Sequence, residues 1–230
     1  MTKCLLISGG TKGLGAAVSK KFAKHDYHIQ ALYHTDLENV DIVNPSNIDY
    51  IKHDVSKMPF NLICPEKLDE IVIIHNATAS FTPRPMHLSD LSDYRRHWDT
   101  AVGGAHNLIY PNLHLINKVS RFTVIAILSS IVEEGPPKGF APYLSAKMAL
   151  NGLIKSISVE FGWRGVRSIC ICPTFMSTSL TKSWDERLQQ SIGNGNTLTT
   201  EFVAAKIFDL SHSIEAPMNG QNYLIKAGDI

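Results

Sequence analysis

Short apolar runs of strand length alternate along the whole chain with segments whose apolar residues recur at the period of an α-helix. This alternation constrains the fold more than any other feature of the sequence. The runs contain few polar positions, which is typical of parallel strands covered by helices on both faces. The predicted strands are Lys3–Ser8, Tyr27–Tyr33, Ile48–Lys52, Glu70–His75, Phe122–Ser129, Arg167–Cys172 and Asn222–Ile225. The clearest predicted helices are Gly13–His25, Ser89–Tyr110, Ala141–Gly162 and Thr200–Leu210, the last with Thr200 as its N-cap.

These units predict an α/β fold, a single-domain doubly wound parallel sheet of the Rossmann-like kind with helices on both faces. A chain of 230 residues can bury one core, so we expect one domain over residues 1–230. In such a sheet the ligand crevice lies at the carboxyl ends of the strands.

Composition argues against several classes of partner. The net charge of +1 favours neither nucleic acid nor membrane as a partner. The first apolar run is too short for a signal segment, and no run approaches the length of about eighteen residues that a membrane span needs. The four cysteines show no C-x-x-C spacing, and the ten histidines form no metal-binding motif. We expect a cytoplasmic protein without disulfides or a metal.

A glycine-rich turn follows the first predicted strand and opens the first helix. Glycines at 9, 13 and 15 let the chain turn sharply, approach a pyrophosphate closely and present the helix N-terminus to it. The turn predicts a dinucleotide site. The alternative is a glycine-rich turn that connects strand and helix without binding a nucleotide. Its candidate cofactor-binding residues are Ser8, Gly9, Thr11, Lys12, Gly13, Leu14 and Gly15.

Tyr143 and Lys147 lie four residues apart on a predicted helix, so they share one face. A phenol with an ordinary pKa near 10 exchanges protons poorly at neutral pH, and a neighbouring cation favours the phenolate. The pair therefore predicts acid–base chemistry, although amphipathic helices also produce this spacing by chance.

Together these motifs resemble those of the short-chain dehydrogenase/reductase family, in particular 3-oxoacyl-carrier-protein reductases. The turn is similar to the family's T-G-x-x-x-G-x-G, with Ser8 at the threonine position, and Ser130 precedes Tyr143 by the family spacing. The segment from Pro173 to Thr178 is similar to P-G-x-x-x-T, with Thr174 at the glycine position. Matches continue to Asn219-Gly220-Gln221, so the resemblance covers essentially the whole chain.

The resemblance implies roles for individual residues. The implied catalytic group consists of Ser130, Tyr143 and Lys147. In this group Ser130 holds the substrate oxygen, and the neighbouring Ser129 is the alternative residue for that role. Lys147 and Tyr143 also contact the cofactor. Further implied cofactor contacts are Asp54, Val55, Asn76, Ala77, Pro173, Thr174 and Thr178; His75 and Thr78 replace the outer residues of Asn-Asn-Ala-Gly.

Cofactor choice is expected at the end of the second strand, where an acid would bind the ribose hydroxyls of NAD. Tyr33, His34 and Thr35 stand there instead, and Lys12 occupies a position that is often basic in NADP-using members. We expect NADP(H), with Tyr33 and His34 near the ribose; the alternative is a solvated Lys12 and NAD(H).

One family residue is missing. Aligning the N-x-x-G pattern on Gly104 puts Ala101 where the family has an asparagine that holds a water next to the lysine. Thr100, His97 and His106 are candidates to replace it. We expect a working enzyme; the alternatives, if no other group holds the water, are slower proton exchange or the loss of strong catalysis.

The predicted function is reversible carbonyl/alcohol interconversion with NADP(H), on a small-molecule or carrier-bound carbonyl such as a 3-oxoacyl group. The alternatives are an NAD(H)-dependent alcohol or sugar dehydrogenase and a non-catalytic dinucleotide-binding sensor or scaffold.

A lid over an apolar or extended substrate is consistent with the side chains of Trp184, Leu188 and Ile192. Lys182, Arg187 and Arg84 are candidates for a phosphate contact, with solvated charge as the favoured alternative. The resemblance also implies a homodimer or homotetramer through Ser89–Tyr110 and Ala141–Gly162.

Overall fold

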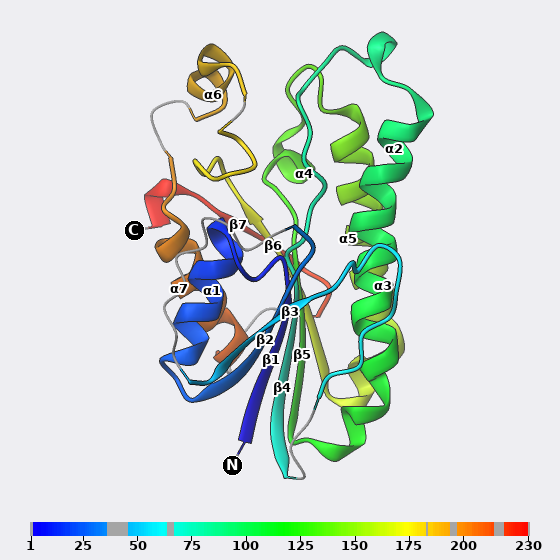
Figure 1. Ribbon diagram of the computed structural model, residues 1–230, viewed down its shortest axis with the longest axis vertical. Coiled ribbons are helices and arrows are strands. Elements are labelled where there is room, and N and C mark those ends of the chain that lie inside the picture. The colour runs from blue at the N-terminus through cyan, green and yellow to red at the C-terminus, as the bar shows by residue number, and fades with distance from the viewer. Residues whose placement is uncertain are drawn as a thin grey trace.

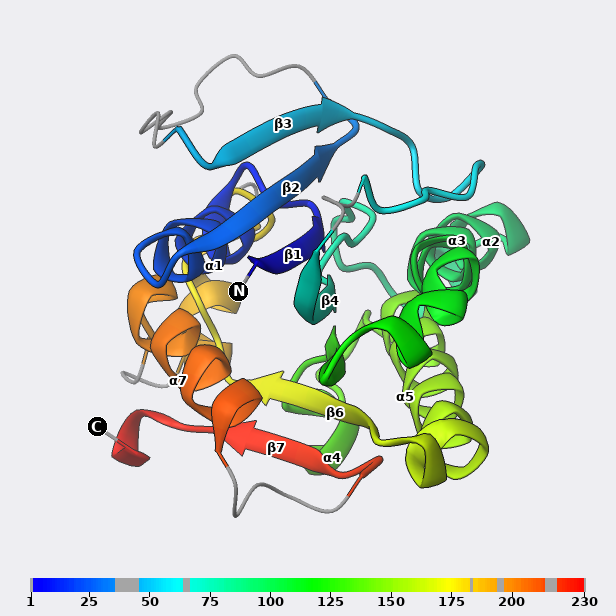
Figure 2. The same cartoon turned by 90° about the horizontal axis from the view of Figure 1, so that it is seen from below.

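A parallel sheet of seven strands forms the centre of the molecule (Figures 1 and 2). The computed structural model describes residues 2–35, 46–63, 67–182, 184–193, 197–213 and 219–229. The strand order is β3-β2-β1-β4-β5-β6-β7. The strands are β1 (Thr2–Ser8), β2 (Tyr27–Tyr33), β3 (Ile48–Lys52), β4 (Leu68–His75), β5 (Arg121–Ile127), β6 (Val166–Pro173) and β7 (Asn222–Ile225). The predicted doubly wound fold is confirmed, and all seven predicted strands are present with small differences at their ends.

Helices cover both faces of this sheet (Figure 2). One layer consists of α1 (Gly13–Ala23) and α7 (Thr200–His212), and the other of α2 (Leu91–Trp98), α3 (Gly104–Ile109) and α5 (Ala141–Phe161). Each layer packs on its own cluster of buried aliphatic side chains. The strand order reverses between β1 and β4, so the crevice expected in this topology opens at their carboxyl ends.

The segment predicted as one helix over Ser89–Tyr110 is helical without a break from Leu91 to Ile109, but its hydrogen-bonding pattern changes in the middle. Asp90 caps α2 by accepting hydrogen bonds from the backbone N–H groups of Ser92 and Asp93. A π-helical turn, Asp99–Gly103, separates α2 from α3. After α3 the chain tightens into a 3₁₀ helix, Tyr110–Lys118, which contains a proline in its first turn.

Helix ends also differ from the predictions. The cap of α7 is Thr199 rather than Thr200, because the Thr199 hydroxyl accepts from Phe202 N at 3.2 Å. Two short helices, α4 (Ile131–Glu134) and α6 (Glu186–Gly193), were not predicted, and α6 lies above the carboxyl ends of the strands (Figure 1). The remaining 3₁₀ turns are Met86–Leu88, Gly162–Arg164 and Ala227–Asp229.

Cys4, Cys170 and Cys172 are buried and are not disulfide-bonded, while Cys64 lies outside the described residues. Burial raises the pKa of both the Cys170 and Cys172 thiols to about 12, so these two remain protonated. Among the described helices, none has the length and apolar character needed to cross a membrane.

Candidate active site

The glycine turn between β1 and α1 has a backbone that only glycine accepts readily. Gly9 and Gly13 have φ values of +64° and +50°. A Cβ atom on Gly15 would lie 1.9 Å from the Gly9 carbonyl oxygen, so a side chain there would displace the turn. These positions keep the N-terminus of α1 open to a ligand.

Ser8 and Asn76 attach this turn to the end of β4. The Ser8 hydroxyl oxygen accepts from the backbone N–H groups of Asn76 and Ala77, both at 3.1 Å. The Asn76 amide donates to Gly9 O at 2.9 Å and to Ser8 O at 3.3 Å. Ser8, Asn76 and Ala77 therefore shape the crevice, and Asn76 ties neighbouring strands together.

The N-terminus of α1 has no side-chain cap and no acidic residue in its first turn. Its dipole is therefore free to act on an anion. Thr178, from the segment after β6, lies opposite: a Cβ on Gly13 would stand 3.4 Å from Thr178 Cβ. Thr11 and Leu14 are buried, so their side chains support the turn. The fold thus brings together two predicted cofactor segments from opposite ends of the sequence.

The ends of β2 and β3 also meet as predicted. His34 Nε2 lies 3.5 Å from an Asp54 carboxylate oxygen, and Tyr33 is half-buried beside it in the chain. Burial raises the pKa of Asp54, but hydrogen bonds from Ser56 and the nearby His34 and Lys57 outweigh burial and hold it below its usual range. Val55 is buried. At this edge, His34 and Asp54 form an ionisable pair.

Tyr143 and Lys147 lie one turn apart on the inward face of α5. Both are buried, with 8% and 3% of their surface exposed. Lys147 Nζ lies 5.6 Å from the centre of the Tyr143 ring and donates to Ile127 O at 2.7 Å. The ammonium group is therefore held at the end of β5, within reach of the phenol.

The pKa values differ from the expectation that Lys147 lowers the pKa of Tyr143. Burial raises the pKa of Tyr143 to about 12, with Cys172 adding to the rise and the Ser129 hydroxyl opposing it. Burial lowers the pKa of Lys147 to about 8. In this closed arrangement desolvation dominates both groups.

Ser129 and Ser130 point to different partners. Ser129 forms the side-chain hydrogen bond that lowers the pKa of Tyr143, whereas the Ser130 side chain hydrogen-bonds Glu134. The Ser130 backbone N–H donates to Pro173 O at 2.9 Å, which joins the ends of β5 and β6. The position beside the phenol, predicted for Ser130, is thus held by its competitor Ser129, because α4 begins at Ile131 and turns Ser130 toward Glu134.

An aromatic cluster encloses the phenol; it consists of Phe81, His97, Phe140, Tyr143 and Trp184. Phe81 stacks on Tyr143 with ring centres 4.9 Å apart and 15° between the planes. The Trp184 indole N–H donates to Phe81 O at 2.9 Å. Sequence reasoning identified Trp184 but missed Phe81, which approaches Tyr143 only through tertiary packing.

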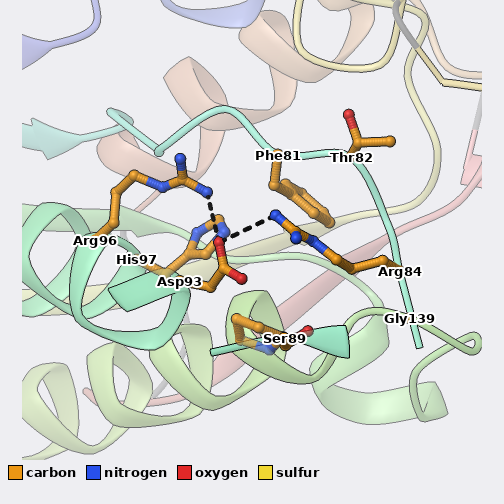
Figure 3. Close-up of a pocket in the computed structure, with 9 residues that line it drawn as sticks. Phe81, Thr82, Arg84, Ser89, Asp93, Arg96, His97 and Gly139 are labelled. Carbon is orange, nitrogen blue, oxygen red and sulfur yellow. Dashed lines mark hydrogen bonds and ion pairs between the residues drawn. The ribbon is translucent and has the colours of Figure 1, made fainter. Parts of the chain in front are cut away.

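The cluster borders a cavity of about 20 Å³, which has room for a water molecule (Figure 3). Beside it Arg84 and Arg96 both pair with the Asp93 carboxylate, at 3.4 and 3.2 Å. Arg84 therefore already has an anionic partner, and Lys182 and Arg187 are exposed. None of the three is held in a phosphate site by the described residues.

Thr174 follows the end of β6, and its N–H donates to Ile225 O at 3.0 Å. Its hydroxyl oxygen is buried and has no partner among the described residues. A buried, unsatisfied hydroxyl beside Pro173 is free to meet a polar group of a cofactor. Within the described ranges, no cluster of three His, Cys, Asp or Glu residues could hold a metal ion.

The structure separates the candidates for the missing asparagine. His106 is exposed and stacks on Tyr110, and the Thr100 hydroxyl donates to Arg96 O at 3.0 Å. His97 is buried against the aromatic cluster, and burial lowers its pKa to about 4. Ala101 is buried in the π-helical turn, close to His75, which sequence reasoning noted only as a departure from the family motif.

The family model described as short chain dehydrogenase matches residues 3–189, so the chain belongs to this family of oxidoreductases. It is 23% identical to a 3-oxoacyl-[acyl-carrier-protein] reductase of Chlamydia muridarum, covering 99% of this chain and 97% of that protein. It is 26% identical to a mitochondrial borneol dehydrogenase of Lavandula x intermedia, over 98% and 90%.

Solved structures show the same fold. One is ElxO with NADP bound, at 23% identity and a TM-score of 0.78, covering 99% of this chain and 98% of that one. Another is a 3-ketoacyl-(acyl-carrier-protein) reductase from Brucella melitensis with NADH, at 18% identity and a TM-score of 0.80, covering 98% and 97%. The predicted resemblance to the family is confirmed.

Proposed function

We propose that the protein is an NADP(H)-dependent oxidoreductase that interconverts a ketone and a secondary alcohol, reducing a ketone such as a 3-oxoacyl group. The observation that supports this most directly is the buried Tyr143 and Lys147 on one face of α5, with Ser129 beside the phenol. Lys147 is held at the carboxyl end of β5, and the glycine turn follows the carboxyl end of β1 on the same edge of the parallel sheet.

The crevice residues fit a dinucleotide. Gly9, Gly13 and Gly15 allow a pyrophosphate to approach the uncapped N-terminus of α1. Thr178 faces this turn, and the unsatisfied Thr174 hydroxyl lies at the end of β6, where it suits the amide of a nicotinamide. When bound, the nicotinamide supplies or accepts the hydride.

The preference for NADP(H) rests on charge. Neither Tyr33, at the end of β2, nor His34 after it is an acid, and the Asp54 carboxylate near this end is paired with His34 and Lys57. Lys12 stands at the start of α1, where it can form a charge-assisted hydrogen bond with a 2′-phosphate. NAD(H) is the alternative, and both dinucleotides occur in the similar structures described above.

The protein's own groups divide the proton chemistry between them. Tyr143 delivers the proton to the substrate oxygen during reduction and removes it during oxidation. Ser129, or Ser130 after a local rearrangement, holds that oxygen by a hydrogen bond. Lys147 stabilises the phenolate and is positioned by Ile127 O. Phe81 must leave the face of Tyr143 for a substrate to enter.

Turnover assays with NADPH and NADH test this proposal on 3-oxoacyl thioesters, cyclic ketones and oxidised sugars. We expect NADPH-dependent reduction of at least one ketone, and a loss of about 100-fold or more in Tyr143→Phe, because the proton donor is removed. Tight dinucleotide binding without turnover, identical in wild type and Tyr143→Phe, would instead support a sensor or scaffold.

The Lys12→Ala variant tests cofactor choice by comparing dissociation constants for the two reduced dinucleotides. We expect affinity for NADPH to fall by about tenfold, since a charge-assisted hydrogen bond is lost, while affinity for NADH stays unchanged. Equal changes in the affinities for NADPH and NADH would contradict the assignment of NADP(H).

We also propose the cytoplasm as the site of action, consistent with the three buried cysteines that form no disulfide.

A further inference from the structure

The cavity beside the aromatic cluster lies between the loop from β4 to α2, α2 itself and the start of α5 (Figure 3). Phe81 and His97 line this cavity and also contact the ring of Tyr143. Pro142, which precedes Tyr143 in the chain, forms part of the same wall. The cavity and the phenol therefore share the ring of Phe81 as a common wall.

Two guanidinium groups at this cavity share a single carboxylate. Arg84 and Arg96 approach the same oxygen of Asp93, at 3.4 and 3.2 Å, and Figure 3 shows both side chains directed toward it. The other Asp93 oxygen accepts from the Asp90 backbone N–H. Burial lowers the pKa of His97 to about 4, so its ring is neutral near neutral pH. One positive charge among the residues that line the cavity is therefore not balanced.

The same groups have hydrogen-bond donors available. A guanidinium carries five N–H bonds, of which Arg96 directs one to Asp93, and Arg84 directs one to Asp93 and one to Leu88 O. Both arginine side chains are about half exposed, at 52%. Ser89 adds a buried hydroxyl without a partner in the part of the chain that the structure describes. The lining therefore offers more donors than acceptors, which suits an anion.

The backbone around Arg84 is held in place. Pro83 and Pro85 flank it, and a proline restricts both its own φ and the residue before it. The Arg84 N–H donates to Gly139 O at 3.3 Å, and a Cβ on Gly139 would stand 2.9 Å from Arg84 N, so the glycine permits this approach. The guanidinium is therefore presented from a restrained segment, which lowers the entropy lost when a ligand binds.

A ligand that reaches Tyr143 must displace the Phe81 ring. The space that the ring leaves joins the phenol to the cavity, which by itself has room only for a group the size of a water molecule. A substrate in this joined space has its ketone at the phenol and its other end at Arg84 and Arg96. The two ends are separated by about the width of one aromatic ring, so only a few bonds lie between them.

We propose that Arg84, Arg96 and Ser89 form a carboxylate subsite, so that the protein selects a ketone that carries a carboxylate a few bonds from its carbonyl group. Guanidinium groups bind a planar carboxylate through parallel N–H···O bonds, and one carboxylate matches the one unbalanced charge. A phosphate would bring more negative charge than the lining can balance. The subsite rests on the proposed function, because it names the class of ketone that Tyr143 reduces.

Oxo acids of increasing length, from acetoacetate through levulinate, and their neutral methyl esters are matched probes of this subsite. In Arg84→Met we expect the KM for the best oxo acid to rise by about tenfold or more, since a charge-assisted hydrogen bond is lost. Its kcat, and both constants for the ester, should change by less than about twofold. Arg96→Met should behave alike. Each variant leaves Asp93 paired with the remaining arginine, so both should fold.

Asp93→Asn separates anion binding from a structural role. The amide keeps an oxygen for the arginines and removes the competing charge, so the KM for the oxo acid should fall by at least about threefold, with no change for the ester. A purely structural disturbance would not improve the affinity for the anion alone. Arg95→Met is the matched control, because Arg95 on α2 lines the hollow with Tyr94 and Trp98 instead of the cavity, and it should change neither KM.

Calorimetric titration of an oxo acid into the protein saturated with oxidised dinucleotide tests the subsite without turnover. We expect binding that weakens by about tenfold in Arg84→Met and Arg96→Met. Equal affinities for oxo acids and esters in the wild type, or equal effects of the arginine substitutions on both, would overturn the subsite. Tighter binding of dihydroxyacetone phosphate than of any oxo acid would overturn the choice of carboxylate. Arginine-dependent binding of an oxo acid in a protein that reduces no ketone rejects the proposed function alone.

Discussion

At the scale of single residues, the clearest question is which of the two adjacent serines after β5 acts beside Tyr143. Only Ser129 contributes a hydrogen bond to the Tyr143 phenol, while the Ser130 side chain bonds Glu134. The family spacing favours Ser130, whereas the effect of the Ser129 hydroxyl on the pKa of Tyr143 favours Ser129. The same substitution at both positions can distinguish them.

We predict that Ser129→Ala lowers kcat by about 100-fold, because the substrate oxygen and the phenol lose a shared hydrogen-bonding group. Ser130→Ala should lower kcat by less than about tenfold. Steady-state kinetics with one ketone provides the comparison. The reverse order would mean that α4 rearranges when substrate binds and turns Ser130 inward.

Lys147 makes a second prediction at this scale, concerning stability. Burial lowers its pKa from 10.5 to about 8, so between these values the unfolded chain binds more protons than the folded one. The free energy of unfolding should therefore rise as pH increases from about 8 toward 10, by up to about 3 kcal/mol. Above pH 10 the raised pKa of Tyr143 opposes the rise, since the unfolded phenol then ionises first.

Urea denaturation at several pH values measures this effect, with Lys147→Met as the reference. The difference in unfolding free energy between wild type and Lys147→Met should grow in favour of wild type over this pH range. A constant difference would show that the lysine is solvated and carries its charge in the folded protein.

At the scale of elements, the loop from β4 to α2 closes the crevice through Phe81. Trp184, just before α6, holds this loop through its hydrogen bond to Phe81 O. The closed arrangement places a ring against Tyr143 where a substrate would approach. Phe81 and Trp184 therefore cover the phenol together.

We predict that Phe81→Ala lowers the KM for a bulky cyclic ketone by about tenfold, because substrate no longer displaces a stacked ring. Stability should fall by about 2 to 3 kcal/mol, since Phe81 is only partly buried. Kinetics and urea denaturation test the two effects. A higher KM would show instead that Phe81 forms part of the wall that binds substrate.

At the scale of the whole molecule, the outer face of α2 and α5 carries large apolar side chains. Leu91 and Trp98 on α2 are 63% and 51% exposed, and Met148 on α5 is 49% exposed. Tyr94, Arg95, Trp98 and Ser145 line a hollow of about 240 Å³ between these helices. We propose that this face forms the interface of a homodimer or homotetramer.

Trp98→Glu should shift the protein toward monomers, because it places a charge in the apolar face. Sedimentation velocity measures the change, and Trp163→Glu is the matched control, since Trp163 is 82% exposed and lies after α5. A wild-type monomer, or equal effects of both variants, would contradict this interface.

Local patterns were sufficient to predict the strands, the glycine turn and the shared face of Tyr143 and Lys147. Apolar runs, glycine at sharp turns and helical spacing depend on neighbours in the sequence. The resemblance to the family, and not local patterns, singled out Asn76 and Thr178, and these residues lie on the same edge as Ser8 because the ends of parallel strands share an edge of the sheet.

Other features depend on contacts between distant segments, and these only the folded protein decides. Phe81 reaches Tyr143 from another loop, and Gly104 receives the ring of His75 from β4. The π-helical turn, the orientation of Ser129 and Ser130 and the raised pKa of Tyr143 likewise follow from packing and desolvation. Local spacing identifies which groups can do chemistry, but burial and long-range contacts determine their protonation and access.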